Sequence, residues 1–100
     1  MGMNMRDIQR MQQKLVKMQE ELEKTIFTGT AGGGAVTIKM SGKFEITDVK
    51  IDPEAFSADE INELEVMVRA AAKDAFDKAT DAQQKLISGA TGGMRIPGLF

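Results

Sequence analysis

The sequence predicts an α+β fold in which an N-terminal helix, a three-stranded antiparallel sheet and a long C-terminal helix follow one another along the chain. Two stretches of helical periodicity flank a central segment, residues 25–53, in which apolar and polar residues alternate. The length of 100 residues fits one α+β domain, which we place at residues 1–88, followed by a flexible glycine-rich tail at 89–100. Because a domain of this size buries only a modest core, we expect it to assemble as a homodimer.

The first predicted helix extends from Asn4 to about Lys24. Its apolar residues recur at intervals of three and four, which is the spacing of a heptad seam: Ile8, Met11, Leu15, Met18 and Leu22. Three heptads are few for an independent coiled coil. We therefore expect this seam to pack partly on the sheet and partly on a partner chain, as the dimer interface.

Cations line another face of the same helix, roughly opposite the seam at 100° per residue: Arg6, Arg10, Lys14 and Lys17. Positive charge in the first turns, with glutamates near the end, opposes the helix dipole, so helix stability does not explain this order. Two interpretations stay open. The stripe is either a surface for a phosphate-like target or an ordinary solvated face.

The pattern of the central segment predicts three antiparallel strands. The first begins within Thr25–Thr30, where β-branched residues replace helix formers. The second strand alternates, and a turn at Ser41-Gly42 leads into the third. The apolar residues of the second and third strands are Val36, Ile38, Met40, Phe44, Ile46, Val49 and Ile51.

The third strand changes parity between Ile46 and Val49. One extra residue near 47–48, a β-bulge, keeps its apolar side chains on one face. We expect this sheet to be a floor shared by both helices. Gly32-Gly33-Gly34 precedes the second strand and lacks the lysine and following helix of a phosphate-binding loop, which favours a strand entry.

The second helix is predicted from the capping box Ser57–Glu60 to about Ser88, after Asp52-Pro53 ends the last strand. Its apolar and small residues fall on one side: Ile61, Leu64, Val68, Ala71, Ala75, Ala79, Ala82 and Leu86. The alanines allow another element to approach closely.

Composition excludes most kinds of active site. The chain has no cysteine and no histidine, and it contains no nucleophile motif, Walker loop or zinc spacing. We therefore expect no enzyme activity, no metal or other cofactor and no small-molecule substrate. No apolar run is long enough to cross a bilayer and no signal peptide is recognisable, so we expect a cytoplasmic protein without a membrane partner.

Four segments follow one another along the chain: the Met- and Gln-rich first helix (Met11 to Leu22), Gly32 to Val36, Val49 to Pro53, and the ending Gly92-Gly93-Met94-Arg95-Ile96-Pro97-Gly98-Leu99-Phe100. In this order they resemble the YbaB/EbfC family of bacterial nucleoid-associated proteins. The resemblance extends over nearly the whole chain. It implies a tweezer-shaped homodimer that binds duplex DNA in the nucleoid.

In that family both terminal helices are implicated in DNA contact. Carried over by position, the resemblance points to Arg6, Arg10, Lys14 and Lys17 on the first helix and to Arg69, Lys73, Lys78 and Lys85 on the second. The net charge of −2 is unusual for a DNA-binding protein, so binding should be local and strongly salt-dependent. The alternative is a cytoplasmic adaptor that recruits a protein through the Met-rich seam and the apolar tail.

Overall fold

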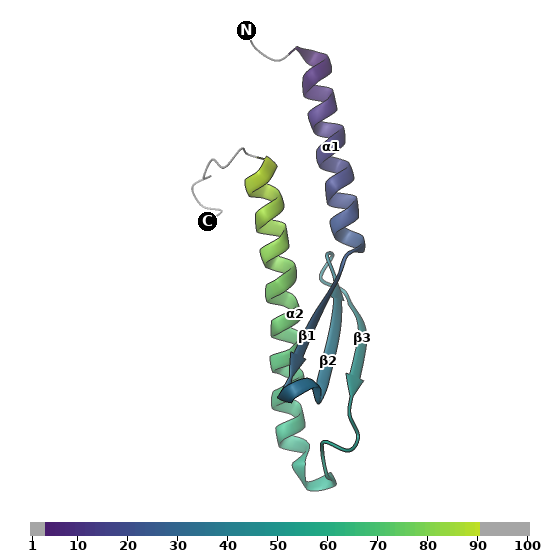
Figure 1. Cartoon of the computed structure of the whole chain (residues 1–100), viewed down its shortest axis with the longest axis vertical. Helices are drawn as coiled ribbons and strands as arrows, with labels where there is room; N and C mark the ends of the chain where they lie inside the picture. The colour runs from purple at the N-terminus through teal and green to yellow at the C-terminus, as the bar shows by residue number, and fades with distance from the viewer. Residues whose placement is uncertain (1–3, 91–100) are drawn as a thin grey trace.

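The computed structural model describes residues 4–90 and contains the predicted helix, three-stranded sheet and long helix in the predicted order (Figure 1). The bounds are α1 Met5–Lys24, β1 Ile26–Ala31, β2 Val36–Ser41, β3 Ile46–Ile51 and α2 Ile61–Ala90. Short 3₁₀ turns lie at Gly32–Gly34 and Ala58–Glu60. The predicted glycine-rich tail lies, from residue 91 onward, outside the described residues.

Helix α1 extends beyond the sheet instead of lying on it. It begins at Asn4, whose side chain accepts a hydrogen bond from the Asp7 amide at 2.9 Å. None of its residues is buried, and its contacts are with α2 and β2. Figure 1 shows it continuing away from the top of the sheet. The prediction that both helices share the sheet as a floor is therefore wrong for α1.

The strands are antiparallel in the order β1-β2-β3. Between β2 and β3, Lys39 pairs with Asp48 but Met40 pairs with Ile46, which leaves Thr47 as the extra residue of a bulge. The predicted bulge is thus confirmed. Its consequence is that the apolar residues of β3 lie opposite those of β2, on one face of the sheet: Ile46 with Met40, Val49 with Ile38, and Ile51 with Val36.

Helix α2 packs on this apolar face, over β1 and β2. The core consists of branched or long side chains from the sheet and alanines from the helix: Val36, Ile38, Met40, Ala71, Ala75 and Ala79. A Cβ on Gly29 would collide with the backbone carbonyl of Ala71, so glycine allows this close approach. Ile61, predicted on the buried side of the helix, is 58% exposed.

Side chains of α2 also cover the outer edge of β1. The Asp74 carboxylate accepts a hydrogen bond from the Thr30 amide at 3.1 Å, and the Lys78 ammonium donates to the Thr28 carbonyl at 2.7 Å. These bonds use backbone groups that would otherwise face solvent at the strand edge. The sheet is therefore closed along β1 and ends in β3 on the other side.

Candidate nucleic-acid interface

The basic stripe predicted from the sequence lies on α1. Its four residues, Arg6, Arg10, Lys14 and Lys17, are all exposed. At about 1.5 Å per residue, the eleven helical steps from Arg6 to Lys17 cover roughly 16 Å along the axis. Within residues 4–90, none of the four forms an ion pair with an acidic side chain.

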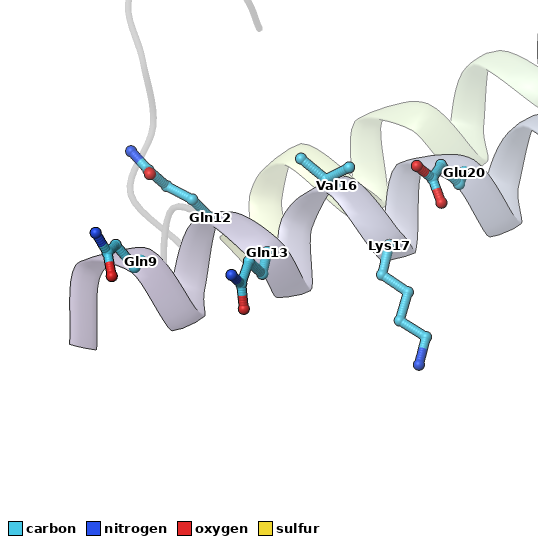
Figure 2. A pocket seen from close by; sticks show the side chains of 6 residues that line it. All are labelled: Gln9, Gln12, Gln13, Val16, Lys17 and Glu20. Atoms are coloured by element: carbon cyan, nitrogen blue, oxygen red, sulfur yellow. The ribbon is translucent and has the colours of Figure 1, made fainter. Parts of the chain in front are cut away.

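The stripe borders two different surfaces of α1. Lys17 lies next to a polar surface formed by Gln9, Gln12 and Gln13 together with Val16 and Glu20. Figure 2 shows that all six side chains come from one helix, so this surface is an open helix face and no cavity. Lys14 instead lines a groove on the side of the apolar seam. The stripe therefore separates an amide-rich face from an apolar one.

That groove lies between the two helices. Met11, Leu15 and Met18 of α1 line it together with Gly89 of α2. Further along, Leu22 faces Ala82 and Leu86. The predicted interface seam thus points toward the C-terminal half of α2, and four of its five residues remain 37–47% exposed.

The cations of α2 stand in a different environment. Three of them are exposed partners of aspartates one turn away: Lys73 with Asp77 at 2.6 Å, Lys78 with Asp74 at 3.3 Å, and Lys85 with Asp81 at 2.9 Å. Among the four, Arg69 alone has no acidic partner in the described part of the chain. The positive charge of α2 is therefore largely balanced on the helix itself.

The pKa values of two of these groups reflect the pairing. A hydrogen bond to Asp77 raises the pKa of Lys73. The pKa of Asp74 is lowered, chiefly by the hydrogen bond from the Thr30 amide and further by Lys78. Sequence reasoning detected the aspartates near the lysines but not the contacts of Asp74 and Lys78 with β1, because their partners lie 44 and 50 residues away.

Other kinds of site find little support. No group of three or more acidic side chains within residues 4–90 could hold a metal ion. Over the same residues, neither helix is long and apolar enough to span a membrane.

Comparison with known proteins assigns the chain to a family. Residues 1–94 match the model of the YbaB/EbfC DNA-binding family. A nucleoid-associated protein of Dictyoglomus turgidum is 43% identical over 97 residues, covering 96% of this chain and 93% of that protein. One from Pelotomaculum thermopropionicum is 39% identical over 100 residues, covering 100% and 95%.

A solved structure supports the fold alone. The uncharacterized protein HP0035 from Helicobacter pylori superimposes with a TM-score of 0.74 at 20% identity, covering 91% of this chain and 100% of that one.

Proposed function

Because the chain belongs to the YbaB/EbfC DNA-binding family, we propose that it binds duplex DNA as a homodimer through the basic stripe of α1. The family is one of DNA-binding proteins and not of enzymes. The relatives are named nucleoid-associated proteins, and we infer the same location for this chain, the nucleoid in the bacterial cytoplasm.

The observation that carries the proposal is the contrast in pairing. The four cations of the α1 stripe have no acidic partner in residues 4–90, whereas three of the four cations of α2 have one. An unpaired surface cation loses no intramolecular contact when it approaches a phosphate, so α1 is the better surface for DNA. We assign Arg6, Arg10, Lys14 and Lys17 the main contacts, and Arg69, Lys73, Lys78 and Lys85 a secondary role.

The chemistry of the stripe favours the DNA backbone over the bases. Duplex DNA carries one phosphate charge per roughly 1.7 Å of its axis, so a stripe of about 16 Å lies within reach of several phosphates. Gln9 and Gln13 are the neighbouring amides able to touch a base edge. Since the net charge is −2, affinity depends on this local surface and should decrease strongly with salt.

The test is a salt titration of binding to a short duplex. In a dimer the stripes supply eight cations, and the logarithm of affinity should fall with the logarithm of salt at a slope of roughly −4 to −7. Replacing Arg10 and Lys14 with Gln should weaken binding to all duplexes alike and reduce that slope by about half. The matched control replaces Lys73 and Lys85 with Gln, which removes the same charge, and should change the slope by less than about 1.

A protein adaptor remains the second candidate, because the groove lined by Met11, Leu15 and Met18 offers apolar surface beside the stripe. The same titration separates the two functions. If the Arg10→Gln, Lys14→Gln variant binds DNA as well as the parent at physiological salt, the stripe is a solvated face and the adaptor function is favoured. The use of the α1 seam as the dimer interface stays a prediction.

A further inference from the structure

The N-terminal half of the α1 seam extends past the end of α2. The two helices run antiparallel, and Figure 1 shows α1 continuing beyond the point where α2 ends. Near the sheet, Leu22 faces the C-terminal third of α2. Leu15 shares a groove with Gly89, and α2 ends one residue later. Beyond that level Ile8 and Met11 continue the seam, 37% and 47% exposed. This end of the seam is left largely uncovered by residues 4–90.

The groove lies where α2 ends. It has a volume of about 280 Å³, and its lining is apolar except for one lysine: Met11, Lys14, Leu15, Met18 and Gly89. A Cβ on Gly89 would meet no atom within 4 Å, so the end of the helix leaves the groove open. Methionine side chains are unbranched and adapt to the shape of an apolar neighbour. The groove therefore suits a short apolar segment.

We propose that residues 94–100 of the same chain occupy this groove. They follow α2 after a linker of residues 91–93 and contain four apolar side chains: Met94, Ile96, Leu99 and Phe100. The proposal goes beyond DNA binding, because it concerns how the exposed half of α1 is held. It limits the flexibility predicted for the tail to the linker before Met94.

The chain that follows α2 is long enough to reach the uncovered seam. Since Gly89 and Leu15 line the same groove, Ala90 lies near the level of Leu15. Ile8 is seven residues further along α1, a distance of about 10 Å. The four residues 91–94 span up to roughly 13 Å when extended. Two glycines in this stretch accept backbone conformations closed to other residues, so the chain can turn from α2 onto the seam.

Covalent attachment favours this segment over the same segment of a second copy. A tail tied through three residues acts at an effective concentration on the order of millimolar. It also avoids most of the loss of translational freedom that association of two chains requires. The tail and the groove therefore meet within one chain even in dilute protein.

The sequence of the tail favours a compact tip. In Ile96-Pro97-Gly98-Leu99, proline and glycine take the two central positions that they prefer in a type II turn. A turn of this kind brings the Cα atoms of Ile96 and Leu99 within about 7 Å of each other. The two side chains then enter a short groove together, whereas an extended strand would pass beyond it.

Charge is complementary at the end of the groove. Four residues on one side of α1 recur at intervals of four, three and four: Asp7, Met11, Lys14 and Met18. Within residues 4–90 the Asp7 carboxylate forms no ion pair. The only charged side chain of residues 91–100 is that of Arg95. Asp7 lies about 12 Å beyond the level of Leu15, within the roughly 16 Å that five extended residues span, so Arg95 can pair with it.

A docked tail ties the N-terminal half of α1 to the end of α2. The cations on the far side of the helix from the seam stay free for other contacts: Arg6, Arg10 and Lys17. The glycines of the linker keep the tie pliant, so it limits the swing of α1 without fixing the helix.

The first test locates the tail by cross-linking in the absence of DNA, so its result does not depend on the proposed function. The chain has no cysteine, so paired substitutions define the two thiols. Met11→Cys with Leu99→Cys tests the groove. The control, Gln13→Cys with Leu99→Cys, uses the amide-rich face of α1 (Figure 2). With a short bismaleimide, mass spectrometry should show the first pair linked within one chain at least about ten times faster than the control.

The second test measures Tm and needs no cysteine. Removing residues 91–100 should lower Tm by more than about 5 °C, since a docked tail stabilises the folded chain. Met11→Gln should lower Tm by about 2 to 4 °C more in the full chain than in the shortened one, because only the full chain has a tail that contacts Met11. The matched control is Val16→Gln, at a residue 57% exposed on the amide-rich face, which should cost the same in both chains.

Three results would overturn the proposal. Equal cross-linking rates for the two cysteine pairs would show that the tail does not prefer the groove. A cross-link that joins two chains would assign the groove to the tail of a second copy. An equal loss of Tm for Met11→Gln in the full and shortened chains would show that the tail does not contact the groove, which then stays open to a protein partner.

Discussion

Helix α1 carries five cations and helix α2 four, yet the packing and the charge pairing of the two helices differ. Helix α2 buries three alanines completely against the sheet, whereas no residue of α1 is buried. The lysines of α2 pair with aspartates, and the cations of α1 have no acidic partner in residues 4–90. The chain thus balances charge where a helix supports the fold and leaves it free where a helix extends from the fold.

The charged residues of the two helices therefore have two different roles. On α2, charge serves the fold, because Asp74 and Lys78 bind backbone groups of β1. On α1, neither packing nor ion pairing accounts for the stripe. A change in α2 should therefore affect stability first, and a change in α1 should affect binding first.

The largest expected effect, a loss of Tm, tests the difference between α1 and α2 in how they pack on the sheet. Gly29→Ala introduces a methyl group against the backbone of Ala71 and Ala75 and should destabilise the fold by roughly 3 kcal/mol, which lowers Tm by more than about 10 °C. Gly42→Ala meets the carbonyl of Leu22 at least as closely, but α1 has no buried residue and can shift away, so this variant should lower Tm by less than half as much.

Gly89→Ala is the control for these thermal melts, because a Cβ there meets no atom within 4 Å. It should leave Tm unchanged or slightly higher. Equal losses for Gly29→Ala and Gly42→Ala would show that α1 supports the fold as strongly as α2 does.

A second change makes α2 resemble α1. Replacing Asp77 and Asp81 with Asn frees Lys73 and Lys85 and removes two negative charges from each chain. We expect tighter DNA binding and a salt slope steeper by about 1 to 3, with little loss of stability, since exposed ion pairs contribute little to folding. Fluorescence anisotropy with a labelled duplex measures the slope. An unchanged slope would place α2 outside the DNA contact even when its lysines are free.

The smallest expected effect concerns acid stability. The pKa of Asp74 lies below its usual 3.8 in the folded chain, so its stabilising contribution is present above that pH and is lost as the pH falls through the folded value. The Tm of the parent should therefore decline more steeply below about pH 5 than that of Asp74→Asn. The control is Asp81→Asn, because Asp81 pairs with Lys85 on the surface of the helix and forms no hydrogen bond with the sheet. The Tm of this variant should follow that of the parent as the pH falls. Parallel curves for the parent and Asp74→Asn would contradict the role of the Thr30 contact.

Local patterns predicted most of the fold. The parity change between Ile46 and Val49 required a bulge, and the register contains it at Thr47. The beginnings of the two helices near Asn4 and Ser57 could be predicted because each capping residue lies within a few residues of the group that it binds.

Features that depend on distant partners were not predictable in the same way. The position of α2 over β1 and β2, with β3 left open, follows from the close approach at Gly29, a contact more than 40 residues away in the chain. The direction of α1 is another such feature. Its seam has the same spacing whether it lies on the sheet or beyond it. The stripe of α1 was visible in the sequence because its four members lie within three turns, but which lysines of α2 are paired required the structure.

The attachment of α1 has a mechanical consequence. The helix is about 30 Å long, and the sheet holds its C-terminal end, where the Gly42 amide donates a hydrogen bond to the Thr25 carbonyl. Since no residue of α1 is buried, we expect it to act as a lever, in which a rotation of about 10° about that end moves the far tip by about 5 Å. This displacement is close to the difference between the minor and major groove widths of B-DNA, roughly 6 and 12 Å. In the proposed homodimer, two such levers would adjust their spacing to the local shape of a duplex without disturbing the core beneath α2.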